Sequence, residues 1–173
     1  ETLFYSGDVC FQDQTILKGA RFEDISADVL ILETTRGERE EPEGQNRETE
    51  LERLTQDILE GLDQKGCVLI PTFALGRTQE ILALLALMTQ QGKLKEQPIF
   101  IGGMGRVFTE IYDLESHRAH RNHTNLQLHE ALNLTVLDYK QLEKIRLKGG
   151  RLFVMTAGMM NENTAAHELA LRL

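Results

Sequence analysis

The sequence predicts an α/β fold with a mainly parallel sheet and helices on both faces. Two observations lead to this prediction. Short apolar runs alternate with helix-like patterns along most of the chain, which is typical of β-α-β units. Runs such as DVLILE (28–33) are apolar at nearly every position, as expected for a central strand that is covered on both faces.

The expected strands are short and follow one another with helical patterns between most of them. LFY (3–5) comes first and ends in the turn Ser6-Gly7-Asp8. Further strands are expected at 28–33, 67–73, 98–103 and 151–156. Right-handed crossovers would place all of these strands in one sheet.

The first expected helix covers 47–64, where apolar residues recur at spacings of three and four. They form one buried stripe, made of Leu51, Leu54, Ile58 and Leu62. Gly66, two residues later, is expected to end this helix, because glycine adopts the backbone conformation found after helix C-termini.

The second expected helix covers 78–91 and contains ILALLALM (81–88), which is apolar nearly all round. It is therefore expected inside the core, with Gly92 at its end. Later segments are expected in a fixed order. They are a helix at 106–114, a polar irregular stretch at 115–125, a weaker helix–strand–helix passage up to residue 148 and a last helix at 162–172.

Composition limits the class of protein and its surroundings. At 173 residues the chain fits one domain, or one domain with a strip of another. A formal net charge of −8 argues against a surface that is basic all over, although RAHRNH (118–123) is locally basic and 38–52 is strongly acidic. No apolar run is long enough to span a membrane, and the first residues do not resemble a signal peptide.

The two cysteines, Cys10 and Cys67, show no paired-motif spacing, so a reducing cytoplasm is the expected compartment. Both are expected to be small buried apolar side chains rather than reactive groups, because their neighbours are apolar.

Polar and small residues follow four of the expected strands directly. They are Glu33, Thr34 and Thr35; Pro71, Thr72, Phe73 and Ala74; Gly102 and Gly103; and Thr156, Ala157 and Gly158. Ligands of open parallel sheets bind beyond the carboxyl ends of the strands. Two of these groups run on into helix starts, at 76–78 and 160–162, whose free N–H groups suit phosphate. Two interpretations are open: these residues only end the strands, which is the commoner case, or together with Arg77 they form a rim that binds phosphodiesters.

Several single residues have both a structural and a functional interpretation. Asp8 is either a turn former or a carboxylate that binds a metal. Glu33 ends an apolar strand, so its carboxylate must reach solvent, a partner or a metal. Arg77 either contacts phosphate or forms an ion pair with Glu80, three residues further on.

His117, His120 and His123 are spaced three apart, which would fan them around a helix by roughly 60° per step. They alternate with arginines in a stretch without a helical pattern. We therefore expect a solvated, locally basic loop rather than a metal site. The sequence also contains no His-x-His pair and no HExxH motif, so the chain alone is not expected to encode a closed zinc site.

Taken together, five segments resemble the metallo-β-lactamase/β-CASP family of nucleases. YSGD (5–8) resembles the fourth metal-binding motif of the metallo-β-lactamase fold, and ADVLILETTRG (27–37) resembles the β-CASP motif that ends in an acidic residue. VLIPTFALGRTQEIL (68–82) is the most specific match. PIFIGGMGRVFTEIYD (98–113) and FVMTAGMMNENTAAHELA (153–170) are similar to the segments that follow it in the family.

The resemblance implies roles for residues at matching positions. Asp8 would bridge two zinc ions, and Glu33 would be the acidic residue that orients the catalytic machinery. Residues 74–80 would be structural and would contact backbone, with Arg77 and Gln79 near a domain interface. The residues assigned to substrate binding are Thr34, Thr35, Thr72, Arg77, Gly158 and His167.

This sequence also departs from the family pattern at two places. Arg36 stands where an aromatic residue is expected, and residues 162–164 replace the Gly-Gly-Arg of the late loop, which weakens a phosphate-binding role there. His167 aligns with the late histidine of that segment, which is not one of the defining catalytic histidines.

The resemblance further implies a division into residues 1–35, the edge of a metallo-β-lactamase domain, and residues 36–173, a β-CASP domain. The family's main histidine motifs would lie outside the chain, so we expect a piece that does not catalyse and holds no zinc stably by itself. The parent would be a zinc-dependent ribonuclease, and this piece would clamp single-stranded RNA, with DNA as an alternative. Its other partner would be the rest of the parent chain. No membrane is expected, and self-association is left open.

Two alternatives of other classes remain. One is a catalytically inactive relative that acts as a scaffold in an RNA-processing complex. The other is an α/β domain that binds a small phosphorylated molecule.

Overall fold

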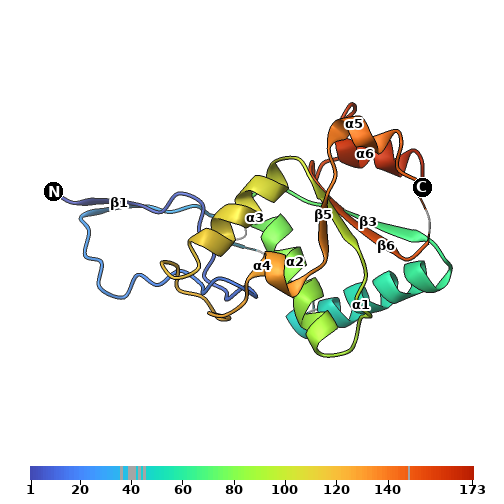
Figure 1. Cartoon of the computed structure of the whole chain (residues 1–173). Helices are drawn as coiled ribbons and strands as arrows, with labels where there is room; N and C mark the ends of the chain where they lie inside the picture. The colour runs from blue at the N-terminus through green and yellow to red at the C-terminus, as the bar shows by residue number, and fades with distance from the viewer. Residues whose placement is uncertain (36, 39–41, 43, 45, 148) are drawn as a thin grey trace.

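The part of the chain that the structure describes builds two separate parallel sheets, one of two strands and one of four (Figure 1). A computed structural model describes residues 1–35, 37–38, 42, 44, 46–147 and 149–173. The strands are β1 (Leu3–Tyr5), β2 (Val29–Ile31), β3 (Cys67–Pro71), β4 (Ile99–Gly102), β5 (Leu134–Val136) and β6 (Arg151–Met155). The helices are α1 (Arg47–Asp63), α2 (Arg77–Gln90), α3 (Met104–Leu114), α4 (Leu128–Ala131), α5 (Tyr139–Leu142) and α6 (Ala165–Ala170).

The larger sheet has the strand order β3-β6-β4-β5, and every neighbouring pair is parallel. Its central strands, β4 and β6, are the most deeply buried, with every residue of β4 covered. Two-sided burial explains why these strands read as nearly continuous apolar runs. The predicted α/β class with a mainly parallel sheet is confirmed.

Helices cover both faces of the larger sheet, as predicted. One core cluster joins α1, α2 and α4 to side chains such as Ile101 and Val154. A second cluster, on the other face, joins α5 and α6 to Phe153 and Met155. In Figure 1, α5 and α6 lie on one side of the sheet and α1 on the other. Successive side chains of β6 therefore lie alternately in two separate cores.

α1 shows how local sequence sets helix ends. The Asn46 side chain accepts a hydrogen bond from the Thr49 amide at 3.0 Å, and the Thr49 hydroxyl accepts one from the Asn46 amide at 3.1 Å. At the other end, the prediction that Gly66 takes the left-handed conformation is wrong. Lys65 takes it, with a φ of 57°, and Gly66 donates its amide hydrogen to Gly61 at 3.1 Å.

The prediction that α2 lies inside the core is confirmed. Its apolar side chains from Leu82 to Met88 are mostly buried, and Gly92, with a φ of 71°, follows its end as expected. The last helix, α6, is shorter than predicted because Thr164 caps it. The Thr164 hydroxyl accepts a hydrogen bond from the amide of His167 at 3.4 Å.

The second expected strand is not a covered central strand, and the expected single sheet is wrong. β2 pairs only with β1 within the described residues, and all three of its residues are exposed. Leu3, Tyr5 and Leu30 are 59%, 68% and 60% exposed. In Figure 1 this pair extends away from the larger sheet. An apolar sequence predicts that a strand will be covered, but it does not say by which partner.

Two further observations concern residues singled out above. The prediction that Cys10 is buried is wrong, because it is exposed and its Sγ lies 3.5 Å from the carbonyl oxygen of Gln12. Arg36, the departure from the β-CASP pattern, lies outside the described residues. Within the described part of the chain, no helix is long and apolar enough to cross a membrane.

Candidate functional site

Asp8 and Glu33 lie at the same end of the two-stranded sheet, where β1 and β2 finish. The Ser6 amide donates to Ile31 at 3.0 Å, and the Ser6 hydroxyl accepts a hydrogen bond from the Glu33 amide at 3.2 Å. The amide of Val9, next to exposed Asp8, also reaches the carboxylate of Glu33. Two carboxylates that are distant in sequence are thereby brought to one edge.

The environment of Glu33 favours its ionised form. The amide of Thr35 donates to the Glu33 carboxylate at 2.9 Å, and the Thr35 hydroxyl adds a second hydrogen bond. These contacts, with a smaller one from Val9, outweigh partial burial and hold the pKa of Glu33 below its ordinary value. Glu33 is therefore a hydrogen-bond acceptor or a partner for a cation at neutral pH, and Thr34 beside it is exposed.

The carboxyl ends of β3, β6 and β4 form a second edge. The Thr72 amide donates to Met155 at 2.9 Å, which links the ends of β3 and β6. The Thr156 hydroxyl donates to Gly102 at 3.3 Å, which links β6 to β4. Gly158 packs against the backbone after β3, where an added Cβ would lie 2.9 Å from the amide nitrogen of Phe73. Three of the four predicted strand-end groups thus meet, whereas the group at Glu33 belongs to the other sheet.

Thr72 and Arg77 differ in how they face solvent at this second edge. Thr72 is buried, and its hydroxyl lies 2.9 Å from the hydroxyl of Thr78 in α2. A ligand would reach the Thr72 hydroxyl only if that hydrogen bond broke. Arg77 is exposed at the first position of α2, directly after Gly76, whose φ of 79° makes the turn into the helix. Arg77 is therefore the accessible cation of the predicted rim.

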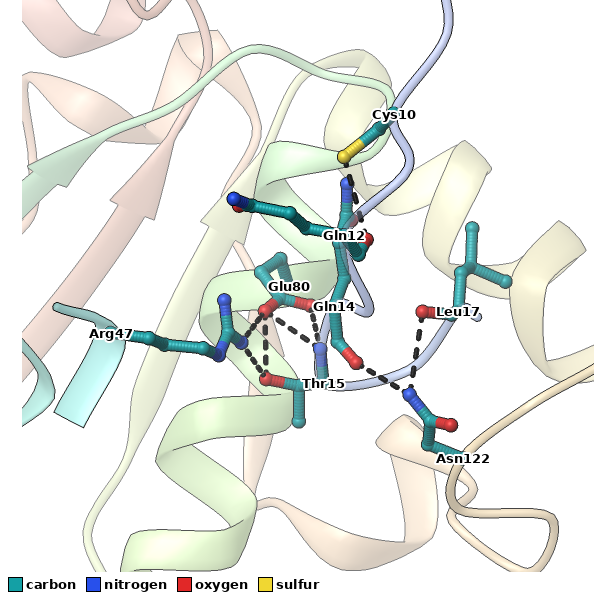
Figure 2. A network of polar contacts seen from close by, with 8 residues as sticks. All are labelled: Cys10, Gln12, Gln14, Thr15, Leu17, Arg47, Glu80 and Asn122. Carbon is teal, nitrogen blue, oxygen red and sulfur yellow. Dashed lines mark hydrogen bonds and ion pairs between the residues drawn. The ribbon is translucent and has the colours of Figure 1, made fainter. Parts of the chain in front are cut away.

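Glu80 does not pair with Arg77, so that structural interpretation of Arg77 is wrong. The Glu80 carboxylate is buried and pairs instead with the guanidinium of Arg47 in α1. It also accepts hydrogen bonds from the amide of Thr15 at 2.9 Å and from its hydroxyl at 2.7 Å (Figure 2). Burial by itself raises the pKa of Glu80, but the hydrogen bonds from Thr15 and Arg47 outweigh it and lower the pKa below its ordinary value.

Gln79, beside Glu80, is a fully buried polar residue. Its carbonyl oxygen accepts a hydrogen bond from the Gly76 amide at 2.8 Å, and its Nε2 donates to Ala74 at 3.2 Å. The same nitrogen donates to Gly105 at 3.3 Å and to the Thr109 hydroxyl at 3.1 Å, both in α3. Gln79 therefore fixes the loop after β3 against α3, in keeping with the structural role expected for residues 74–80.

The histidines singled out in the sequence lie in two different environments. His117, His120 and His123 are exposed in the irregular stretch after α3. His167 lies on α6, where its Nδ1 is buried and has no hydrogen-bond partner among the described residues.

Comparison with known proteins gives a consistent result. No protein-family model matches the chain. A protein of Methanocaldococcus jannaschii called "Probable RNase MJ4" is 31% identical over 178 residues, which cover 99% of this chain and 39% of that protein. "RNase aCSPSF2" of Saccharolobus solfataricus is 32% identical over 62% of this chain and 20% of its own length. "Cleavage and polyadenylation specificity factor 73" of Drosophila melanogaster is 37% identical over 57% of this chain and 14% of its own length.

The chain belongs to the metallo-β-lactamase/β-CASP family. Similarity to the first relative runs along almost the whole chain and includes all five of the matching segments. The β-CASP chain spans well under half the length of each of these relatives.

The family implies a metal centre, and the residues of this β-CASP chain fit one only in part. Among the described residues, no group of three or more His, Cys, Asp or Glu side chains is placed to hold a metal ion. Asp8 offers one exposed carboxylate, and Glu33 stands near it. That is too few oxygen ligands for a closed site.

The contacts of Thr15 and Arg47 with Glu80 were not predicted from the sequence. One signal was available, because a carboxylate in a helix that is apolar nearly all round must be paired if it is buried. The partners themselves lie 65 and 33 residues away along the chain, and no local pattern points to them.

Proposed function

We propose that this chain is the RNA-clamping part of a longer, metal-dependent ribonuclease. The observation that carries the proposal is the meeting of three parallel strand ends, those of β3, β6 and β4, at one edge, with exposed Arg77 at the start of α2, the helix that follows β3. Such an edge offers backbone N–H groups, small residues and a cation, which together suit a phosphodiester backbone. The ribonuclease names of two relatives support RNA as the substrate class.

The clamp would bind the backbone of a single strand and would leave base identity largely unread. Arg77 would contact a phosphate, and Gly158 would take part by letting the loop after β6 pack closely on the loop after β3 at the edge where the strand binds. We also propose substrate contacts for three residues that the resemblance assigns to substrate binding: Thr34, Thr35 and His167. Thr72 would act only indirectly, by holding Thr78 and the start of α2 in place.

Zinc is the metal that we propose for the parent protein. Asp8 would supply a single carboxylate ligand, and Glu33, which is ionised at neutral pH, would position groups around it. The remaining ligands would have to come from parts of the parent outside this chain. We also propose the cytoplasm as the compartment, because cysteines without paired-motif spacing suit reducing surroundings.

We further propose that residues 1–35 are the edge of a metallo-β-lactamase domain and that residues 36–173 form the β-CASP domain. The separate two-stranded sheet with its exposed apolar side chains supports this division, because such surfaces mark contacts with other protein parts. The boundary is not a clean break in packing, since Ile16 belongs to the core of the larger part.

Binding of a labelled single-stranded RNA to this chain, measured by fluorescence anisotropy over a series of salt concentrations, tests the proposal. If Arg77 contacts a phosphate, Arg77→Gln weakens binding by a similar factor for different sequences and lowers the salt slope by about one. Arg53→Gln is the matched control, because Arg53 is an exposed arginine on α1, away from the sheet edge. Equal salt slopes for the two variants would reject the clamp at this edge. A mononucleotide that binds as tightly as the oligomer would favour a site for a small phosphorylated ligand instead.

A further inference from the structure

Residues 10–20 form a closed loop between β1 and β2 that docks on the larger part of the molecule. The loop is closed by the Ala20 amide, which donates to Cys10 at 2.8 Å, and by the Gly19 amide, which donates to the Asp13 carboxylate at 2.7 Å. Its tip carries Ile16, which is 2% exposed and belongs to the main core cluster. The loop is therefore tightly built and inserts an apolar side chain into the α/β core.

One side of this loop is held by Glu80. Both oxygens of its carboxylate accept the Thr15 amide hydrogen, at 2.9 and 3.0 Å, and one of them also accepts the Thr15 hydroxyl at 2.7 Å. Arg47 donates to that same oxygen and to the Thr15 hydroxyl, the latter at 2.6 Å. Figure 2 shows these groups converging from the loop, from α1 and from α2.

The other side of the loop is held by Asn122. Its side-chain Nδ2 donates to Gln14 at 2.8 Å, and its amide donates to Ile16 at 2.8 Å. Leu17 forms an antiparallel bridge with Arg121, and the Lys18 amide donates to His120 at 3.3 Å. The loop thus lies between α2 and the irregular stretch after α3.

The loop also contacts the two-stranded sheet. The rings of Phe11 and Phe22 lie 5.6 Å apart, and the ring of Phe22 lies 5.0 Å from that of Phe4 in β1, both in edge-to-face geometry. A continuous chain of contacts therefore runs from Glu80 through the loop to β1. Asp8 follows β1, and Glu33 is bonded to the same turn.

We infer that Glu80 is a positioning residue that seats the 10–20 loop and thereby fixes the two-stranded sheet, with Asp8 and Glu33, relative to the carboxyl edge of the larger sheet. A carboxylate suits this place because three donor groups from Thr15 and Arg47 converge on it, and no neutral side chain accepts so many hydrogen bonds there. Any effect of this positioning on metal or RNA binding rests on the proposed function. The seating of the 10–20 loop by Glu80 does not.

Amide hydrogen exchange followed by NMR in this chain tests the anchor without metal or RNA. Glu80→Gln is expected to accelerate exchange at Lys18 and Asn122 by about 10²-fold, because their hydrogen bonds join the loop to the larger part and depend on a seated loop, not on a bond to Glu80. Exchange in β6, at Phe153 and Val154, requires unfolding of the larger sheet, so it is expected to stay slower than exchange at Lys18 and to accelerate only as far as Glu80→Gln lowers the overall stability of the fold. Glu110→Gln, an exposed carboxylate on α3, is the matched control and should change neither group.

Three outcomes would overturn the inference. Faster exchange at Thr15 alone would reduce Glu80 to a local hydrogen-bond acceptor. Acceleration at Phe153 and Val154 without acceleration at Lys18, as expected for the core variant Leu85→Ala, would make Glu80 a general stability residue. Unchanged exchange would show that the loop is seated without it. If Glu80→Gln fails to fold, Thr15→Val removes one donor at the same place and must likewise accelerate exchange at Lys18 and Asn122.

Discussion

Replacing Glu80 by Gln should cost this chain about 2–3 kcal/mol of folding free energy at pH 7. Breaking a buried ion pair costs about 3–5 kcal/mol when the remaining charge stays buried. Here the Glu80 side chain is 8% exposed but that of Arg47 is 51% exposed, so the freed guanidinium regains water and the cost falls below that range. Arg47→Gln should cost less, about 1–2 kcal/mol, because both Thr15 donors still satisfy Glu80.

The same side chain predicts a pH dependence with a definite sign. The folded-state pKa of Glu80 lies below its ordinary value of 4.5, so the folded state binds this proton less readily than the unfolded state. Its stabilising contribution is therefore complete above the unfolded pKa and is lost as the pH falls through the folded pKa. The stability difference between wild type and Glu80→Gln should shrink as the pH is lowered from 7 to below 4.

Urea unfolding followed by circular dichroism at several pH values measures both effects. Glu110→Gln serves as control and should stay within about 0.5 kcal/mol of wild type, as exposed substitutions do. A cost of Glu80→Gln below that margin at pH 7, or a difference that stays constant down to pH 3, would refute the account of the buried pair.

Three further predictions concern the candidate edges and the cysteines. In the full-length parent, Glu33→Gln should reduce turnover by about 10²-fold or more and leave the unfolding midpoint nearly unchanged; wild-type turnover would contradict its role. Gly158→Ala should destabilise this chain by about 1–3 kcal/mol in urea unfolding, because the new Cβ would press on the Phe73 backbone; an unchanged midpoint would contradict the close packing. A thiol reagent at pH 8 should modify Cys10 before Cys67, because Cys10 is exposed and burial raises the pKa of Cys67; the reverse order would be inconsistent with this.

Local sequence patterns account for the parts of the fold that depend on neighbouring residues. The three- and four-residue spacing of apolar side chains predicted α1, and the apolar run 81–88 predicted that α2 lies in the core. Because parallel strands place their carboxyl ends at one edge, the amino-acid sequence was enough to group the residues that follow β3, β4 and β6. Helix ends were less certain, since Lys65 rather than Gly66 takes the left-handed conformation.

Only the tertiary structure decided which distant segments meet. The apolar composition of β2 predicted a covered strand, but the strand pairs with β1 outside the larger sheet, because composition specifies burial and not the partner. The spacing of three offered nearby Arg77 as one possible partner of Glu80, whereas Thr15 and Arg47, distant in sequence, hold it instead. A buried charge requires partners, and sequence alone states that requirement, but chain topology determines which residues satisfy it.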